Sequence, residues 1–394
     1  MGEAFLYDAV RTPFGKYAGA LSGTRPDDLA GLVVRELVAR HPELDPARID
    51  EVLLGNANGA GEDNRNVARM ALLLAGLPTS IPAATVNRLC GSSLDAAMVG
   101  SRQIAVGEAD VVVVGGVESM SRAPWVLPKS NRSFPVGDAT LVSTTLGWRL
   151  VNPEMPDAWT VSLGEATELL REREGVGREE QDEFALRSHR AAARAWDDGF
   201  YDNQVVPVPG VDLARDECIR ADTSPERLAG LKPVFRADGT VTAGNASPLN
   251  DGASAALLGS EAAAAMLGAD PLARIAGRGA SALEPEFFGF APVEAANVAL
   301  RRAGIGWGDV GAVELNEAFA AQSLACVKAW DIDPVIVNAH GGAIAIGHPL
   351  GASGTRILGT LARSMAASGE HWGVAAICIG VGQGLAVVLE NVGR

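Results

Sequence analysis

The chain has 394 residues, of which 47% are hydrophobic and 21% charged, and this length and composition predict a soluble protein of two or three domains. Its net charge of -15 argues against a nucleic-acid partner, because proteins that follow phosphates usually carry a basic face. The four cysteines lie far apart without a CxxC pair, which argues against zinc and disulfides and predicts reduced thiols in a cytoplasmic protein.

From the N-terminus onward, residues 1–13 show neither the basic leader nor the apolar core of a signal peptide, and no apolar stretch reaches the length of a membrane span. Short apolar runs at 51–55 (EVLLG) and 110–116 (DVVVVGG) predict strands, the second covered on both faces. Apolar residues at spacings of three and four predict helices over 27–40, 64–76 and 93–106. This alternation predicts an α/β architecture.

Residues 122–245 interrupt the alternation with many prolines and one clear amphipathic helix over 178–196, and we interpret them as an inserted loop domain. A turn-rich stretch at 244–252 is followed by a predicted alanine-rich helix. The alternation resumes near residue 271, with helices over 292–303 and 317–330, strands over 312–315, 372–380 and 385–390, and a glycine-rich turn over 341–354. We therefore expect two similar halves, 1–262 and 270–394.

Cys90 lies in the segment NRLCGSS, directly before the predicted helix 93–106. Backbone N–H groups at a helix start favour an anion, so the segment predicts a thiol with a pKa below the free value of about 8.5. Taken alone, the segment also fits a buried packing cysteine, because free cysteine is among the most buried residue types.

His348 is one of five histidines and lies in the glycine-dense segment GGAIAIGHPLGASG. Glycines let the backbone approach a ligand closely. A helix start disfavours imidazolium, so we predict a neutral imidazole that can accept a proton. The alternative is a loop histidine held by backbone hydrogen bonds.

Two more polar positions follow strand-like segments: Cys378 in CIGVGQG and Asn316 in ELNEAFA. Strand ends of α/β folds often line active sites. A core cysteine and a helix-capping asparagine remain the alternatives. Two thiols, a neutral base and an orienting amide together suit covalent acyl transfer through a thioester, which requires no metal.

These segments, in their order along the chain, resemble the thiolase family. The resemblance covers essentially the whole chain and rests on NRLCGSS, GGVESMSRAP, GTVTAGNAS, NDGA, ELNEAFAAQ, GGAIAIGHPLGASG and CIGVGQG. It implies an α/β thiolase fold of two similar βαβαβαβαββ halves in five layers (αβαβα), with the loop domain inserted in the first half.

The resemblance also implies roles for single residues. Cys90 matches the nucleophile that becomes acylated, His348 the base that activates it, and Cys378 the acid/base that moves the α-proton of the second acyl group. Asn316 matches a residue that holds an oxyanion-hole water, and Gly380 a backbone donor of the second oxyanion hole. Coenzyme A is implied as a co-substrate, with no permanently bound cofactor. Residues expected to contact the CoA or the acyl chain are Ser247, Arg220, Phe288, Leu163, Ala246 and Arg149.

The segments AGEDNRNVARMALLLAGLP and TTLGWRLVNP look like the 3-oxoadipyl-CoA thiolases of aromatic-compound breakdown. They favour cleavage of 3-oxoadipyl-CoA with CoA into succinyl-CoA and acetyl-CoA, or the reverse Claisen condensation. Arg149, in the second segment, is our hypothesis for the partner of the distal carboxylate. Departures from the family pattern at Ser93, Pro248 and Phe288 bear on the preferred acyl chain.

The main rival is a general acetyl-CoA C-acetyltransferase acting on acetoacetyl-CoA or medium-chain 3-oxoacyl-CoA, since the same residues serve both reactions. A ketoacyl synthase would lack the block around Cys378. A non-catalytic acyl-CoA-binding protein should have lost a catalytic residue, and a thiol hydrolase or protease should not depend on free CoA. The family suggests a homotetramer or homodimer, without a membrane or nucleic-acid partner.

Overall fold

The computed structural model describes residues 2–393, and a ten-stranded mixed sheet forms its centre. The strands of this sheet are β1 (Phe5–Arg11), β2 (Gly15–Lys16), β3 (Glu51–Gly55), β4 (Ala83–Val86), β5 (Val111–Ser119), β8 (Asn250–Gly259), β9 (Ala273–Ala282), β10 (Val310–Leu315), β11 (Trp372–Ile379) and β12 (Gln383–Asn391). Their order is β10–β11–β12–β9–β1–β8–β5–β3–β4, with β2 paired to β8. Strands from the two ends of the chain thus meet at β9 and β1.

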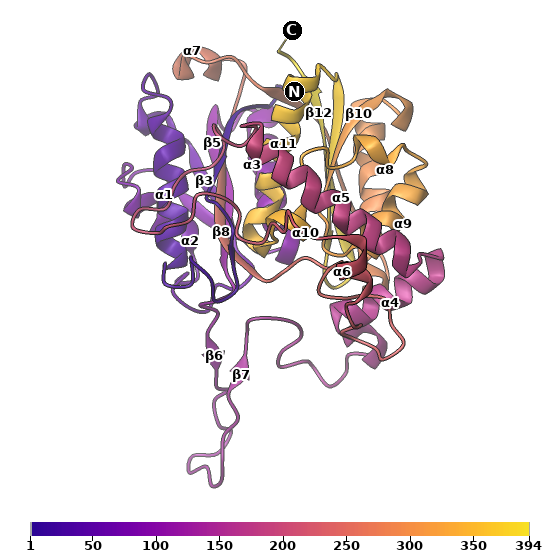
Figure 1. Ribbon diagram of the computed structural model, residues 1–394. Helices are drawn as coiled ribbons and strands as arrows, with labels where there is room; N and C mark the ends of the chain where they lie inside the picture. The colour runs from indigo at the N-terminus through magenta and orange to yellow at the C-terminus, as the bar shows by residue number, and fades with distance from the viewer. Residues whose placement is uncertain (1, 394) are drawn as a thin grey trace.

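The sheet divides into two halves because β1 pairs with β9 only through Phe5 and Leu6. Beyond that point the halves separate, and helices fill the space between them (Figure 1). The main helices are α1 (Pro26–Ala39), α2 (Val67–Leu74), α3 (Ser92–Val106), α8 (Pro292–Ala303), α9 (Ala320–Trp330) and α11 (Leu350–Ser368). Figure 1 shows α1 and α2 on one outer face, α3 and α11 in the middle, and α8 and α9 on the other outer face. This gives the five layers that the resemblance to thiolases implies.

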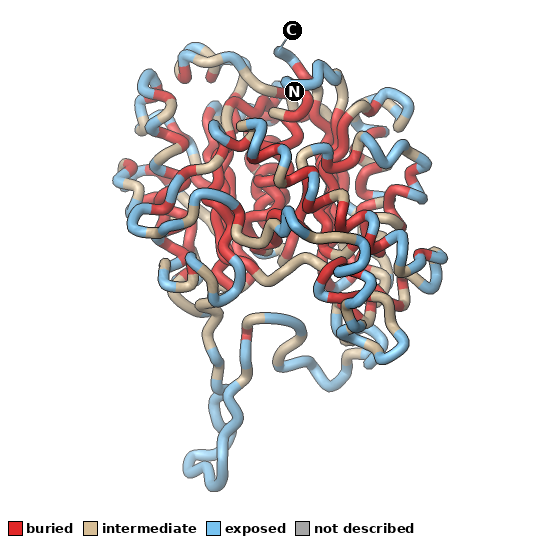
Figure 2. Tube along the Cα trace, viewed as in Figure 1, coloured by how far each residue is buried: buried red, intermediate tan, exposed pale blue. Residues whose placement is uncertain are grey.

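Buried residues concentrate in the two half-sheets and in the central helices (Figure 2). Small residues let these layers approach closely. A Cβ atom on Gly116 of β5 would lie 2.0 Å from the carbonyl oxygen of Gly351 in α11, so only glycine permits this contact. The start of α11 is therefore held directly against the carboxyl end of β5.

The inserted segment carries a hairpin and three helices: β6 (Trp125–Val126), β7 (Val142–Ser143), α4 (Leu163–Glu174), α5 (Arg178–Asp197) and α6 (Pro225–Ala229). The hairpin projects away from the body of the protein (Figure 1). Its tip exposes apolar side chains, among them Phe134 at 89% and Val136 at 92%. The helices instead pack beside the second half of the sheet, where they border the site described below.

The alanine-rich helix predicted after the turn-rich stretch 244–252 is confirmed only in part. Residues 250–259 form strand β8, which is buried along its whole length, and only Ala263–Leu267 form a short helix, α7. β8 lies between β1 and β5, and its small side chains suit a strand covered by helices on both faces. The glycine-rich segment 341–354 also differs from a simple turn, since it contains the short helix α10 (Ala343–Ile346) and the first turn of α11.

No helix among residues 2–393 is long and apolar enough to cross a membrane.

Candidate active site

Cys90 lies in a single 3-10 turn (Leu89–Gly91) between β4 and α3. Leu89 adopts a φ of 46° there, and the Ser92 hydroxyl fixes the turn by donating to the Leu89 carbonyl at 2.6 Å and accepting from the Arg88 N–H at 2.9 Å. Cys90 is 7% exposed and lines two cavities, of about 600 Å³ and 270 Å³. The turn thus presents the thiol to both spaces.

The prediction of a lowered Cys90 pKa is wrong. Burial raises the pKa of this thiol to about 11, and the nearby Glu118 carboxyl adds to the increase. The N–H of Gly380 and the N–H of Cys90 itself oppose this shift without cancelling it. The N–H groups of Gly91 and Ser92 donate to carbonyl oxygens of the preceding turn, so they do not stabilise a thiolate.

His348 lies between α10 and α11, and its backbone N–H donates to the Asn250 side-chain oxygen at 2.8 Å. The imidazole Nδ1 lies 2.6 Å from the Ser353 hydroxyl, which donates its own proton to the Pro349 carbonyl at 2.9 Å. Because a hydroxyl has only one proton to donate, Nδ1 must carry the hydrogen and donate to Ser353. Nε2 is then the unprotonated, basic nitrogen.

The predicted neutral state of His348 is confirmed, for a different reason. Burial lowers the pKa of this imidazole to about 3, and the positive charge of Arg356 lowers it further. Because the pKa of Cys90 is raised and the pKa of His348 is lowered, the two groups are a neutral thiol and a neutral imidazole at pH 7 and form no ion pair.

Asn316 follows β10 and is fully buried. Its side-chain nitrogen lies 3.4 Å from each ring nitrogen of His348. The helix-cap alternative is wrong, because α9 begins four residues later at Ala320 and has Phe319 at its N-cap. Asn316 thus belongs to the polar environment of His348.

Cys378 is the penultimate residue of β11 and is 1% exposed. It packs against Phe288 and Ala318, which line the larger cavity. Burial raises the pKa of this thiol well above its ordinary value, and the nearby Cys90 raises it further. The second thiol therefore lies directly behind the cavity wall, close enough to Cys90 for the two to interact electrostatically.

The remaining residues predicted to contact the substrate or CoA line the two cavities. The larger cavity is lined by Cys90 and His348 together with Ser247, Arg220, Phe288, Leu163 and Ala246. The smaller one is lined by Cys90, Gly380, Leu163 and Arg149. Segments more than 250 residues apart in the sequence therefore meet around one sulfur atom.

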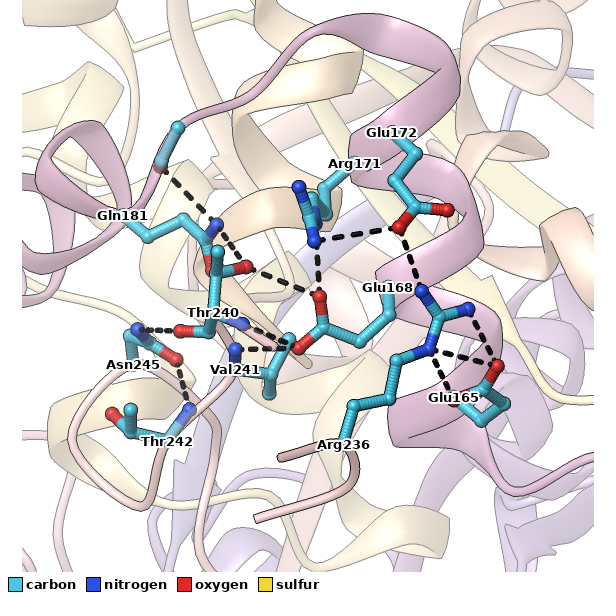
Figure 3. Close-up of polar contacts among 11 residues, drawn as sticks. Glu165, Glu168, Arg171, Glu172, Gln181, Arg236, Thr240, Val241, Thr242 and Asn245 are labelled. Carbon is cyan, nitrogen blue, oxygen red and sulfur yellow. Dashed lines mark hydrogen bonds and ion pairs between the residues drawn. The ribbon is translucent and has the colours of Figure 1, made fainter. Parts of the chain in front are cut away.

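A polar network in the inserted segment holds the wall that carries Ala246 and Ser247 (Figure 3). The buried Glu168 carboxylate accepts the N–H groups of Thr240 and Val241 at 2.7 and 2.8 Å and an Arg171 N–H at 2.9 Å. Ser247 itself donates its hydroxyl to the Ala318 carbonyl at 3.0 Å. These bonds hold the loop against the cavity.

The smaller cavity is mostly apolar, with Leu146, Trp148 and Leu163 in its wall, and Arg149 is the only cation among its described lining residues. The half-buried guanidinium of Arg149 donates to the Asn58 side-chain oxygen and the Thr144 carbonyl, both at 3.3 Å. Within the described part of the chain it forms no ion pair, so its charge has no partner there. A cation held by neutral, long hydrogen bonds is available to an acidic ligand.

Sequence reasoning missed four residues of this environment. Glu118 lines the smaller cavity and accepts the N–H groups of Ala57 and Gly351, both at 2.9 Å. Asn58, Ser353 and Arg356 contact Arg149, His348 and Asn316, respectively. Glu118 and Ser353 lie in segments already singled out, GGVESMSRAP and GGAIAIGHPLGASG, whereas Asn58 and Arg356 lie outside those segments and gave no such signal.

Two family models match the chain, "Thiolase, N-terminal domain" over residues 4–262 and "Thiolase, C-terminal domain" over residues 269–391. The chain is 48% identical to the beta-ketoadipyl-CoA thiolase of Escherichia coli, over 100% of both chains. It is 47% identical to the beta-ketoadipyl-CoA thiolase of Pseudomonas aeruginosa, over 99% of both chains.

Solved structures agree with these matches. The Bacillus anthracis acetyl-CoA acetyltransferase superposes with a TM-score of 0.92 at 38% identity, covering 100% of this chain and 99% of the other. Human mitochondrial 3-ketoacyl-CoA thiolase in complex with CoA superposes with a TM-score of 0.93 at 37% identity, covering 99% and 98%.

Proposed function

The chain belongs to the thiolase family of acyltransferases, and from this premise we propose that it cleaves 3-oxoadipyl-CoA with free coenzyme A, its co-substrate. The products are succinyl-CoA and acetyl-CoA. The acyl group is carried on Cys90 between the two halves of the reaction.

The choice of this substrate rests on Arg149, the single cation among the described residues that line the smaller cavity. Arg149 lies in a mostly apolar space that also contains the Cys90 sulfur, and it has no ion pair among the described residues. A mostly apolar cavity whose described lining includes an arginine without an ion pair suits a short acyl chain with a carboxylate at its far end. Beta-ketoadipyl-CoA thiolases among the relatives support the same substrate.

In the first half-reaction, Nε2 of His348 accepts the proton of Cys90 as the sulfur attacks the ketone of the substrate. The resulting alkoxide collapses, and the carbon–carbon bond between the ketone and the α-carbon breaks. Cys378 protonates the departing acetyl-CoA enolate, which leaves as acetyl-CoA. The succinyl group remains on Cys90 as a thioester.

In the second half-reaction, the Cys378 thiolate accepts the proton of a CoA thiol, which then attacks the succinyl thioester. The Cys90 sulfur leaves and recovers its proton from His348. Both half-reactions develop negative charge on oxygen, for which the N–H groups of Gly380 and Cys90, and a water held by Asn316, are the proposed donors. One such donor is typically worth about 3 kcal/mol.

The larger cavity is the proposed site of the CoA arm. Ser247 and Ala246 line one wall beside the pantetheine, Arg220 lies beside the adenine, and Phe288 and Leu163 bound the acyl end. This placement rests on their shared position around Cys90 and His348.

The test is a thiolysis panel. Purified protein is given 3-oxoadipyl-CoA, acetoacetyl-CoA or a medium-chain 3-oxoacyl-CoA, each with and without free CoA. We expect the highest kcat/KM for 3-oxoadipyl-CoA and no turnover without CoA. A clear preference for acetoacetyl-CoA would instead establish the general acetyltransferase, and turnover without CoA would indicate a hydrolase.

We further propose that the protein is a cytoplasmic homo-oligomer, a tetramer or dimer. The projecting hairpin supports this, because its exposed Phe134 and Val136 would otherwise remain in contact with water. The four free cysteines support a reducing compartment. Light scattering of the wild type and of a F134S/V136S variant tests the assembly: loss of mass in the variant supports the hairpin contact, and an unchanged mass excludes it.

A further inference from the structure

Arg356 is a buried cation that contacts Asn316 and acts electrostatically on His348, two of the proposed catalytic groups. It lies in α11, and its side chain is 0% exposed. One guanidinium nitrogen, Nη1, pairs with the Glu314 carboxylate of β10 at 3.1 Å. The other, Nη2, donates to the side-chain oxygen of Asn316 at 3.4 Å. The guanidinium therefore bridges the Glu314 carboxylate and the Asn316 side chain.

These contacts decide how the Asn316 amide is turned. Its oxygen accepts a hydrogen bond from Arg356, and its NH2 group lies 3.4 Å from both ring nitrogens of His348. Turning the amide by half a rotation would bring its NH2 group against the guanidinium. Both groups can only donate there, so the reversed orientation loses a buried hydrogen bond and leaves donors unpaired.

One face of α11 therefore controls both polar groups of the site. Ser353 fixes the hydrogen of the His348 ring, and Arg356, three residues later on the same helix face, contacts Asn316. We propose that Arg356 is a positioning residue that keeps the NH2 group of Asn316 directed at His348 and at the oxyanion-hole water that Asn316 is proposed to hold. The inference rests on the proposed function, because it gives Asn316 its donor role.

The charge of Arg356 also acts on His348. Burial lowers the pKa of the imidazole to about 3, and the Arg356 charge lowers it further. The other titratable groups of this region are Cys90 before α3, Glu118 at the end of β5, and the buried Glu314 and Glu317 beside Arg356. Removing the positive charge favours imidazolium, so the pKa of His348 rises and the acid limb of kcat/KM moves to higher pH.

The experiment is a double-mutant cycle of Arg356→Met and Asn316→Ala, measured by thiolysis of the preferred substrate. Arg356→Met is combined with Glu314→Leu in a second variant, because a lone buried carboxylate can prevent folding. We expect each Arg356 variant to lower kcat about 10²-fold with KM for CoA unchanged, as for a misplaced catalytic group. In the Asn316→Ala background the same changes should alter kcat by no more than about twofold.

Arg356→Lys and Thr360→Val serve as controls. Lysine retains the positive charge but cannot hydrogen-bond to Glu314 and Asn316 at once with a planar guanidinium. We therefore expect kcat to fall while the low-pH side of the kcat/KM profile stays in place. Thr360 is buried one turn along α11, and its hydroxyl has no partner in residues 2–393, so valine there should leave kcat and the pH profile unchanged. Histidine NMR should show a raised His348 pKa only in the variants without the charge.

Full additivity of Arg356→Met and Asn316→Ala, or an unshifted His348 resonance in the methionine variants, would overturn the inference. If the wild-type protein showed no thiolysis activity, the proposed function would be overturned. The NMR titration would then still test whether Arg356 lowers the pKa of His348.

Discussion

Replacing Arg149 by leucine tests the substrate assignment most directly. The change places an apolar side chain in the wall of the smaller cavity and removes the only cation among the described residues that line it. A substrate with a terminal carboxylate loses its partner, whereas acetoacetyl-CoA, which has no such carboxylate, does not. The expected effect is therefore a change in selectivity.

The size of the effect follows from the exposure of the guanidinium. A hydrogen bond to a charged group is worth about 1.5–3 kcal/mol. Arg149 is half-buried and held by two long hydrogen bonds, so solvent screening places it at the lower end of that range. About 1.5–2 kcal/mol corresponds to a loss of roughly 10- to 30-fold in kcat/KM for 3-oxoadipyl-CoA.

The assay compares kcat/KM for 3-oxoadipyl-CoA and acetoacetyl-CoA in the wild type, Arg149→Leu and Arg149→Lys. Arg132→Leu, on the exposed hairpin, is the matched control and should change neither value. Lysine should restore part of the preference, since it retains the charge without the bidentate fork. An equal loss on both substrates, or no loss on 3-oxoadipyl-CoA, would refute the reasoning.

Three further outcomes are expected. Cys90 should react slowly with iodoacetamide at pH 7 and about tenfold faster for each pH unit up to its raised pKa of about 11; fast labelling at pH 7 that Cys90→Ala removes would contradict the stored thiol–imidazole pair. Cys378→Ala should still form the acyl-enzyme and lose α-proton exchange of acetyl-CoA in deuterated water; wild-type exchange in this variant would refute the role of the second thiol. Burial alone would raise the pKa of Glu168, but hydrogen bonds from Val241, Arg171 and Thr240 outweigh it and lower the pKa. Because the carboxyl pKa is lower in the folded than in the unfolded protein, the ionised Glu168 stabilises the fold at a pH above its unfolded-state pKa, and this stabilisation is lost as the pH falls. Glu168→Gln should therefore lower the free energy of unfolding by about 1.5–3 kcal/mol at pH 7 and by progressively less below about pH 4. Urea unfolding at several pH values measures this, and a cost independent of pH would contradict it.

Much of the fold follows from local sequence pattern. The predicted strand 51–55 and the predicted helix 292–303 coincide with β3 and α8, because an apolar run or an amphipathic spacing with flanking glycine is a local property. The alanine-rich helix predicted after residue 252 begins only at Ala263, because residues 253–259 belong to β8. Alanine favours a helix in isolation, and only the neighbours β1 and β5 on either side make this stretch a strand.

The candidate site divides in the same way. Motifs located Cys90, His348, Cys378 and Asn316 as the groups of interest, because reactive side chains in glycine-rich segments at strand and helix ends are visible in a sequence. Their ionisation was not visible there. The expected low pKa of Cys90 ignored the burial that raises it.

The sequence by itself determined the amphipathic elements, their order and the chemical identity of the reactive groups, since these depend on residues close together in the chain. Only the tertiary structure decided which nitrogen of His348 is basic, which way the Asn316 amide turns, and that Arg149 lines a cavity with Cys90 and forms no ion pair within residues 2–393. Those properties depend on desolvation and on partners from distant segments, and both arise only when the layers pack.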